Sequence, residues 1–575
     1  MFKQVFCNHK TIFLVSWVAS AAKGILGIAN VFLLQYMIDA AVKGAFSMSG
    51  KWLLALAVSY IMIQILGALI TNLKISISNH IEKEVDGAIL HQCSTIQYQY
   101  YEDAATYPMI DQIMREGKTK IKQINNVMYQ MIEFAVRIVG ILAYITAVQW
   151  WFGVILLLLT IPMWVLTIIA AGKEGQASRD NWKYYRHSKL FSNILNSREY
   201  VKEAKIFNTY SLIGKRWNEN MKYFQDGKIK ANIKERFIIG YINIAQYLLT
   251  IVLILCMIGP VRNGQISIGA LVSTMNSVWE LIGTGLFVIY EVLFVVMDYQ
   301  VFKGTLKKFF ELKREDLDGG DPLQHINHIE VQDLWYRYPG EENYVLNGVS
   351  FAAGEKEHVA LVGENGCGKS TLVKLMLGLL QPEKGRIYIN HKPAEQYKLQ
   401  DRRRAFACVF QDYVRYNLTL KENVQIGDLR EEKEDVKVVA ALHRIDPMLL
   451  SEIGGSLDKK LGKLTSESQD ISGGQWQKVA LARAEYSSAG VIVMDEPTSA
   501  IDPILEKNMI EQLTKNNTHR MAFMITHRLG SVQKMDKVIV LKDGKVKAQG
   551  SHGKLIKEDE YYAKLYKTQE KWYKE

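Results

Sequence analysis

Cysteine and proline are both scarce in this chain, which has five cysteines and ten prolines among 575 residues. The cysteines are widely spaced and form no CxxC pair, so they suggest neither a disulfide framework nor a zinc site. Internal repeats and low-complexity tracts are also missing. A hydrophobic content of 49% and a charged content of 22% exclude a disordered, collagen-like or coiled-coil chain. The length allows about four folding units.

Long apolar runs, in contrast, crowd into the first half of the chain. A helix that crosses a membrane needs about 20 mostly apolar residues. Six stretches satisfy this requirement, at residues 11–40, 52–73, 127–148, 151–171, 237–261 and 268–297. The first is too long for the core of a secretory signal peptide and is soon followed by another span. The sequence therefore predicts an all-α transmembrane domain of six helices.

Positive charge is concentrated on one side of these predicted spans. The formal net charge is +11. Six basic residues lie in segment 74–126 and fifteen in segment 172–236, whereas the loops on the other side hold three. Because basic loops face the cytoplasm, we expect a multi-pass protein of the plasma membrane with both termini in the cytoplasm. Topology explains the charge, so no nucleic-acid partner is predicted, and the run Arg402-Arg403-Arg404 is interpreted as a solvated face.

The two cytoplasmic segments are rich in helix formers and poor in glycine and proline, which favours spans two to five continuing as helices beyond the bilayer. About 25 extra residues would extend each helix by roughly 35–40 Å. The tips, near 100–107 and 197–204, are candidate contact points with a soluble domain. A charged, Gly- and Pro-punctuated linker at 313–322 is expected to divide a transmembrane domain, 1–312, from a second domain, 323–575.

A glycine-rich loop follows the apolar run His358–Val362, which predicts a buried strand. The loop matches the pattern GxxxxGK[ST] and precedes a helical run, so its N–H groups are expected to cradle phosphate. We predict ATP binding, with Lys369 reaching the β- and γ-phosphates and Ser370 ligating Mg²⁺. The predicted nucleotide-binding residues of the loop are Gly363, Glu364, Asn365, Gly366, Cys367, Gly368, Lys369, Ser370 and Thr371.

One loop residue, Cys367, has a reactive side chain. The surrounding N–H dipoles and Lys369 are expected to favour its thiolate and to make it sensitive to alkylation. The alternative is that Cys367 only fills a small space.

A second buried strand is predicted at Val491–Met494, and Asp495 and Glu496 follow it. A carboxylate at a strand end beside a phosphate loop can complete a Mg²⁺ site, which assigns Asp495 to the metal. The adjacent Glu496 can then orient or deprotonate the attacking water.

Between these elements lies Ile471-Ser472-Gly473-Gly474-Gln475, and here the chain resembles an ATP-binding cassette (ABC) transporter of the exporter-type half-transporter group. The resemblance covers nearly the whole chain. It implies an α/β P-loop ATPase domain with a helical subdomain, in which Ser472 to Gln475 meet the γ-phosphate held by another protomer. Further matching positions are Tyr338 for adenine stacking, Gln411 for Mg²⁺ contact and sensing of the membrane domain, Asp502 for the dimer interface and His527 for the γ-phosphate.

Three features depart from the family pattern. Ile471 replaces the commoner leucine, and Trp476 stands where a basic residue is usual. The segment Leu464–Asp470 lacks the glycine that exporters usually carry before the signature. In the family this segment contacts the membrane stalks, so the departure concerns coupling and not ATP hydrolysis.

The resemblance implies a dimer with a second copy or a related half-transporter, which sandwiches two ATP molecules between its protomers. Its expected activity is ATP-driven export of a polar or amphipathic peptide, lipid or drug-like molecule from a lipid membrane. The six spans exclude a soluble ABC ATPase. A siderophore-type importer and a non-transporting ATP-gated channel or sensor stay open as alternatives, and vectorial flux distinguishes a transporter from the latter.

Charged residues inside the predicted spans are candidates for the transport path, because ionisable groups in a membrane normally face a bundle interior or an aqueous cavity. Glu280 and Glu291 lie about three turns apart on one face of the sixth span. Glu133 and Arg137 are spaced to pair with each other on the third span. Lys23 has no partner within its own helix and is expected to pair with one of these acidic residues across the bundle.

Overall fold

The computed structural model describes residues 6–430, 434–463, 466–496, 520–526 and 532–574, and the chain divides into two compact units. The first unit comprises Met1–Ser94 and Met109–Glu311. The second comprises Thr95–Pro108 and Leu312–Glu575. Segment 95–108 therefore belongs to the second unit although the helices of the first flank it. The single boundary near 313–322 that the sequence predicts does not include this feature.

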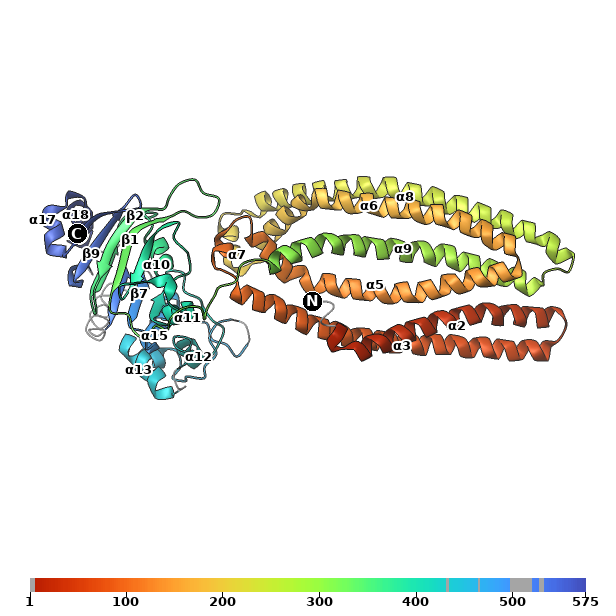
Figure 1. Ribbon diagram of the computed structural model, residues 1–575, viewed down its shortest axis with the longest axis horizontal. Coiled ribbons are helices and arrows are strands. Elements are labelled where there is room, and N and C mark those ends of the chain that lie inside the picture. Colours follow the sequence, from red (N-terminus) through yellow and green to blue (C-terminus); the bar gives the residue numbers. More distant parts are fainter. Residues whose placement is uncertain (1–5, 431–433, 464–465, 497–519, 527–531, 575) are drawn as a thin grey trace. The chain divides into compact units, whose positions relative to one another are not determined.

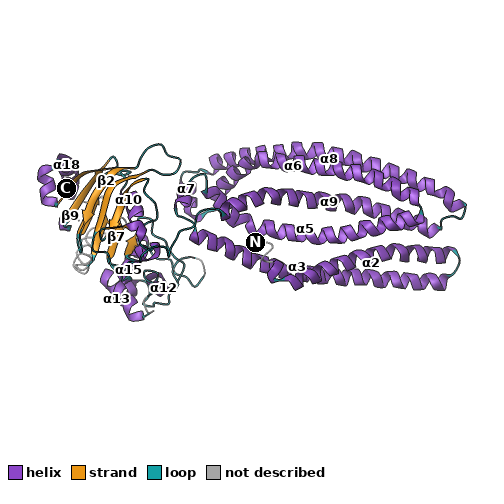
Figure 2. Cartoon of the chain, viewed as in Figure 1, coloured by secondary structure: helices purple, strands orange, loops and turns teal. Residues whose placement is uncertain are grey.

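Long helices build the described part of the first unit (Figures 1 and 2). Helices α6 and α8 pack against each other along their length, and α9 packs against both α2 and α6. Helices α3 and α8 contain 50 and 53 residues and are therefore about 75–80 Å long, far beyond the roughly 30 Å of a bilayer core. The prediction of helical extensions is confirmed. The bounds are α2 Lys10–Val42, α3 Phe46–Thr95, α5 Tyr107–Val148, α6 Trp150–Asn196, α7 Arg198–Ile206, α8 Tyr210–Arg262 and α9 Ile268–Phe310.

Five helical stretches of the described chain are long and apolar enough to cross a membrane. They are Lys10–Val42, Phe46–Thr95, Tyr107–Val148, Trp150–Ile169 and Asn243–Arg262. The predicted sixth span, 268–297, lies within the continuous helix α9 but is not one of these five, so it stays a prediction.

The junction between α2 and α9 shows how two distant segments are fixed in the first unit. Ser267 caps α9, its hydroxyl accepting a hydrogen bond from the N–H of Ala270, and the same hydroxyl donates to Asp39 at 2.7 Å. The N–H of Gly269 donates to the Asp39 carboxylate at 2.8 Å. A Cβ at Gly269 would lie 2.3 Å from the carbonyl oxygen of Gln35, so this close approach requires glycine.

The second unit contains two sheets. A four-stranded antiparallel sheet has the order β2-β1-β4-β5, and a six-stranded sheet has the order β10-β9-β3-β8-β7-β6. The strands from β9 to β6 in the second sheet are parallel, and β10 pairs antiparallel to β9. The strands are β1 Ile329–Tyr336, β2 Leu346–Ala353, β3 His358–Val362, β4 Lys384–Ile389, β5 Lys392–Pro393, β6 Phe406–Val409, β7 Val491–Asp495, β8 Met521–Ile525, β9 Lys537–Lys542 and β10 Lys545–Gly550.

Helices flank these sheets, and the two predicted buried strands are confirmed. Every residue of β3, β7 and β8 is buried, as expected for parallel strands covered on both faces. The helices of the unit are α4 Gln99–Glu102, α10 Lys369–Met376, α11 Leu399–Arg404, α12 Leu420–Gln425, α13 Asp435–Ile445, α14 Leu449–Glu452, α15 Gly473–Tyr486, α17 His552–Glu558 and α18 Glu560–Lys574.

Helices α12 to α15 form a helical subdomain, and its apolar core explains one departure from the family pattern. Trp476 is 1% exposed and belongs to the same buried cluster as Leu420, Val438 and Ile453. Ile471 is buried in this cluster as well. An indole at position 476 therefore serves packing, which a basic side chain at this position would not supply.

The interpretation of the run Arg402–Arg404 as a solvated face is wrong for its first two members. Arg402 is buried, and its guanidinium donates to the carbonyl oxygens of Leu375 and Met376 at the end of α10. Arg403 donates both terminal nitrogens to the Glu315 carboxylate at 2.6 and 2.8 Å. The last carbonyls of a helix lack partners within the helix, and a buried guanidinium that satisfies them cannot be recognised from charge alone.

Candidate active site

The parallel strands bring three sequence-predicted elements to one edge of the six-stranded sheet. Strands β3, β8, β7 and β6 are neighbours in that order and run in the same direction, so their carboxyl ends share an edge. The glycine-rich loop follows β3, Asp495 ends β7, and Gln411 comes two residues after β6. His527 and Asp502 lie outside the described residues.

Glycine is required at defined points of the loop. Gly366 and Gly368 have φ values of +81° and +100°, and Gly368 caps the amino end of α10. A Cβ at Gly363 would lie 2.3 Å from the carbonyl oxygen of Leu541 on β9. The loop thus passes close to the sheet and then points the N–H groups at the start of α10 outward, which is the geometry of an anion cradle.

Lys369 is buried within this loop. Its ammonium donates to the carbonyl oxygens of Gly363 and Glu364 at 2.9 and 2.8 Å and lies 3.8 Å from the sulfur of Cys367. The prediction of a favoured thiolate at Cys367 is wrong, because burial raises the pKa of this thiol and the opposing charge of Lys369 does not compensate. Cys367 is 8% exposed and packs in the apolar core between the sheets, which agrees with the space-filling alternative.

Asp495 and Glu496 have different environments although they are adjacent. Asp495 is buried, and burial raises the pKa of its carboxyl although the Ser370 hydroxyl and the Lys369 charge act in the opposite direction. Glu496 has φ +48°, an uncommon conformation for a side chain of this kind, and its N–H donates to the carbonyl oxygen of Ile525 on β8. The backbone therefore turns sharply at Glu496, directly after β7.

Gln411 connects the ends of β6 and β7. Its side-chain amide donates to the Glu496 carboxylate at 3.1 Å, and it orients this group. The donor set formed by Asp495, Ser370 and Gln411 offers a carboxylate, a hydroxyl and an amide oxygen, the hard oxygen ligands that Mg²⁺ prefers. A divalent cation would also supply the countercharge that the buried Asp495 needs. These residues therefore fit a magnesium ion.

Tyr338 lies at the rim of a cavity of about 740 Å³, a size suitable for a nucleotide. Its hydroxyl is 3.1 Å from the Thr371 hydroxyl, and its ring packs edge-on against Tyr336 with centroids 5.2 Å apart. The cavity is lined by Glu102, Ala104, Tyr338, Pro339, Glu341, Asn343, Tyr344, Val345, Glu364, Asn365, Gly366, Cys367, Lys542, Asp543 and Gly544. The loop and the aromatic residue predicted for adenine thus share one cavity.

The signature segment begins helix α15 with a capping box. The Ser472 hydroxyl accepts from the N–H of Gln475, and the Gln475 side chain accepts from the N–H of Ser472 at 3.0 Å. Tyr413 donates its hydroxyl to the carbonyl oxygen of Gly473 at 2.9 Å. Ser472 and Gly473 are exposed, and a Cβ at Gly473 would meet no atom within 4 Å. Glycine here is therefore not required by packing within this chain, and it leaves the helix start open to a ligand.

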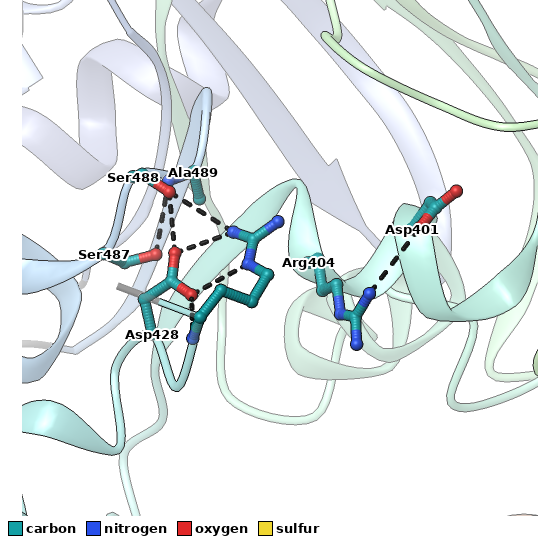
Figure 3. A network of polar contacts seen from close by, with 7 residues as sticks. Asp401, Arg404, Asp428, Ser487, Ser488 and Ala489 are labelled. Carbon is teal, nitrogen blue, oxygen red and sulfur yellow. Dashed lines mark hydrogen bonds and ion pairs between the residues drawn. The ribbon is translucent and has the colours of Figure 1, made fainter. Parts of the chain in front are cut away.

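A polar network holds the other end of α15 (Figure 3). Asp428, which follows α12, accepts from the guanidinium of Arg430 at 2.7 Å and from the Ser488 hydroxyl at 2.6 Å. The Ser487 hydroxyl accepts from the N–H of Ala489 at 3.2 Å and orders the connection from α15 to β7. The hydrogen bond from Arg430 keeps the pKa of Asp428 well below its usual range although burial opposes this. The helical subdomain is thereby joined to the strand that carries Asp495.

An ion pair that the sequence does not indicate lies next to the site. Glu102 of α4 accepts from Lys374 of α10 at 2.7 Å and from the Tyr98 hydroxyl at 2.6 Å. Burial alone would lower the pKa of Lys374, but the hydrogen bond with Glu102 raises it overall. The tip predicted near 100–107 therefore contacts the helix that starts at the phosphate loop. The sequence predicts the tip that carries Glu102. It does not indicate the partner Lys374, which lies 272 residues away in the chain.

In the first unit, the charged residues of the predicted spans pair across helices. Lys23 of α2 donates to Glu133 of α5 at 3.0 Å, and Arg137 of α5 forms an ion pair with Glu280 of α9. Arg137 also lies 3.7 Å from Glu133, so the four side chains form one chain of alternating charge. Arg137 thus pairs both with Glu133 on its own helix and with Glu280 across the bundle. Glu291 is half-buried on the same helix as Glu280.

Comparisons with known proteins agree with this geometry. Residues 13–282 match the family "ABC transporter transmembrane region", and residues 346–499 match the family "ABC transporter". The nisin transport ATP-binding protein NisT of Lactococcus lactis subsp. lactis is 27% identical over 99% of this chain and 95% of its own length. The subtilin transport ATP-binding protein SpaT of Bacillus subtilis is 28% identical over 98% of this chain and 92% of its own.

The fold has a solved counterpart. The structure of a bacterial Atm1-family ABC exporter with ATP bound superimposes with a TM-score of 0.78 at 19% identity, and the match covers 98% of this chain and 99% of that one. The helical membrane region, the α/β domain that follows it and the order of the motifs lead to one assignment. The chain belongs to the ABC transporter family, as a multi-pass membrane protein in which a transmembrane region is fused to an ATP-hydrolysing domain that drives transport.

Proposed function

We propose that this transporter works as a dimer and exports an amphipathic peptide at the expense of ATP. The observation that carries the ATP-dependent part is the convergence of Lys369, Asp495, Glu496 and Gln411 at one sheet edge beside a nucleotide-sized cavity. The peptide assignment is supported by the two relatives that match over nearly full length, both of which are named for the transport of a peptide, nisin or subtilin.

Within one protomer, different residues have different roles in ATP hydrolysis. The N–H groups of the loop from Gly363 to Thr371 and the Lys369 ammonium bind phosphate oxygens, and Tyr338 stacks on the base. When bound, Mg²⁺ supplies charge neutralisation between the phosphates, held by Ser370, Asp495 and Gln411. Glu496 orients the attacking water and accepts its proton, with Gln411 holding the carboxylate in place.

The dimer follows from the exposed start of α15. Ser472 and Gly473 are exposed, and a Cβ at Gly473 would meet no atom within 4 Å, so their own chain leaves this helix start uncovered. A helix amino end attracts anions, so we propose that these residues contact the phosphate bound by the partner protomer. His527 and Asp502, if they follow the family pattern, complete the phosphate contact and the interface.

Coupling is assigned to the ion pair between Glu102 and Lys374. Because Glu102 lies on the tip between α3 and α5 and Lys374 lies on α10, displacement of the phosphate-loop helix pulls directly on that tip. We expect Glu102→Gln to reduce cargo transport more than basal ATP hydrolysis, since it removes a charge-assisted bond and leaves the carboxyl ends of the strands intact.

The cargo class is supported by the chain of charges from Lys23 to Glu280. These side chains are 21–30% exposed in the single chain, so they are not fully buried among apolar residues. Ionisable groups with this access line polar paths through membranes. A surface with both signs of charge suits a peptide with charged and apolar side chains better than a purely apolar molecule.

The decisive experiment is transport in proteoliposomes with the ATP-binding domain facing outward. We expect ATP-dependent accumulation of a labelled cationic amphipathic peptide in the lumen, and none with Glu496→Gln. A labelled phospholipid serves as the comparison cargo. Flipping of the lipid without peptide uptake would overturn the peptide assignment, and peptide efflux under ATP would indicate an importer. Equal ATP-dependent uptake of any small ion would favour a channel.

A further inference from the structure

Two histidines and a glutamate gather on the antiparallel sheet of the second unit, among residues that take no part in the nucleotide site. His328 precedes β1, Glu330 lies on β1, and His391 lies in the turn between β4 and β5. Each offers one candidate ligand atom, and these atoms all lie within 4.8 Å of one another. His328 and Glu330 are half-buried, and His391 is exposed.

Sheet register explains why residues more than 60 positions apart meet here. Strands β1 and β4 are antiparallel, with Ile329 opposite Ile389. Residues two apart on a strand share a face, which places His328 and Glu330 on one side. Asn390 and His391 have φ values of +50° and +63°, so the chain turns tightly and returns His391 to the start of β1.

The turn is held in place by one side chain, that of Asn390. Its amide oxygen accepts from the N–H groups of Asn327 and His328 at 2.8 and 3.1 Å, and its amide nitrogen donates to the carbonyl oxygen of His325 at 2.7 Å. The N–H of Asn390 also donates to the carbonyl oxygen of His328 at 2.9 Å. The two segments that carry the histidines are thus fixed to each other before any ligand binds.

The nitrogen atoms of the two imidazoles lie close enough together to meet one ligand. The imidazoles of His328 and His391 are stacked, with centroids 4.5 Å apart and planes 22° apart. Two imidazolium ions would repel each other in this position, whereas neutral imidazole is the form that binds metals. Nδ1 of His328 is buried and has no hydrogen-bond partner within the described part of the chain. A ligand there would supply the missing interaction.

We propose that His328, Glu330 and His391 form a binding site for a divalent transition-metal ion of the zinc class. Two imidazole nitrogens and one carboxylate oxygen are a common donor set for Zn²⁺, with water in the fourth position. Imidazole ligands select against Mg²⁺, so this site and the oxygen-rich site at Asp495 take different ions. Bonds of about 2.0–2.2 Å require the ligand atoms to draw closer, which rotation of the exposed His391 side chain allows.

The test uses the full-length protein in detergent, purified without a polyhistidine tag and stripped with EDTA. In millimolar Mg²⁺ and without nucleotide, Zn²⁺ is titrated against a chromophoric chelator, and Co²⁺ is added to a second sample to record its visible spectrum. We expect one Zn²⁺ per chain and a Co²⁺ spectrum of the intensity typical of four-coordinate nitrogen and oxygen ligands. Absence of stoichiometric binding in competition with the chelator would overturn the proposal.

Variants identify the ligands. His391→Asn keeps a residue that tolerates positive φ and should weaken Zn²⁺ binding by more than roughly 100-fold, since loss of even an outer-shell partner costs 10–100-fold. Glu330→Gln should weaken it as well. His325→Ala is the matched control, because His325 lies beside the site and contributes only its backbone carbonyl. Unchanged affinity in His391→Asn, or an equal loss in His325→Ala, would refute this ligand set. ATP binding by each variant checks its fold.

Discussion

The polar groups of the second unit come from the ends of neighbouring strands, whereas those of the first unit come from helices that are distant in the sequence. Lys369, Asp495 and Gln411 each stand within a few residues of a parallel strand, so backbone pairing alone brings them together. Lys23 and Glu133 are 110 residues apart, and Arg137 and Glu280 are 143 residues apart. The first arrangement is fixed by a sheet. The second depends on how helices pack, and it changes when they move.

The largest effect is expected for a substitution in the site at the edge of the six-stranded sheet. Glu496→Gln preserves the size and hydrogen bonding of the side chain but removes the carboxylate that we propose as the base for the attacking water. ATP turnover should fall by roughly 10²–10⁴-fold, the usual contribution of acid–base catalysis, while nucleotide affinity stays similar. Phosphate release and binding of a fluorescent ATP analogue by the purified protein measure the two quantities.

The control for this change is Glu355→Gln, which alters an exposed glutamate that forms an ion pair with its neighbour Lys356. Its turnover should equal that of the unmodified protein. If Glu496→Gln also hydrolyses ATP at a near-normal rate, Glu496 is not the base. The site at the sheet edge then lacks its proposed catalytic residue.

Sequence patterns predicted the second unit well because its site is specified by local features. A buried strand followed by GxxxxGK[ST] fixes a loop and a helix start, and the structure has both at Gly363–Met376. Patterns failed where burial depends on the tertiary fold. Charge alone predicts a surface position for Arg402, which instead caps α10. Loop dipoles predict a thiolate at Cys367, whose pKa is instead raised by burial. No local signal linked Glu102 to Lys374 or His328 to His391, because those partners meet only once the sheets and helices have formed.

An intermediate effect is expected in the first unit, where the charges pair across helices. Glu280→Gln removes the partner of Arg137 on α9 and leaves Glu133 to neutralise it. Peptide-stimulated ATP hydrolysis should change several-fold while basal hydrolysis stays close to normal, since the nucleotide site is untouched. A double-mutant cycle with Arg137→Gln should give a coupling energy of about 0.5–3 kcal/mol in thermal or denaturant unfolding.

Bound nucleotide should change the coupling energy between Arg137 and Glu280. Charges held by helix packing should change their coupling when the helices rearrange, so the cycle is repeated with Mg·ATP bound to the Glu496→Gln protein. Additive effects of the two substitutions in both states would show that Arg137 and Glu280 do not interact. Labelling of Glu280 by a lipid-phase carboxyl reagent would place it against lipid instead of inside the bundle.

The smallest effect is expected for the alkylation rates of two cysteines, one buried in the second unit and one exposed in the first. Cys367 is buried in the phosphate loop, and Cys7 is exposed in the first unit. Burial raises the pKa of Cys367, so little of it is thiolate near pH 7, and the thiolate is the nucleophile. Iodoacetamide should therefore modify Cys367 at least several-fold more slowly than Cys7, and raising the pH should accelerate the reaction because each unit of pH below the pKa multiplies the thiolate fraction by about ten. Mass spectrometry of tryptic peptides measures both rates in one sample. Equal rates at pH 7 would mean that the loop opens enough to hydrate Cys367, and the site would then be less fixed than its strands suggest.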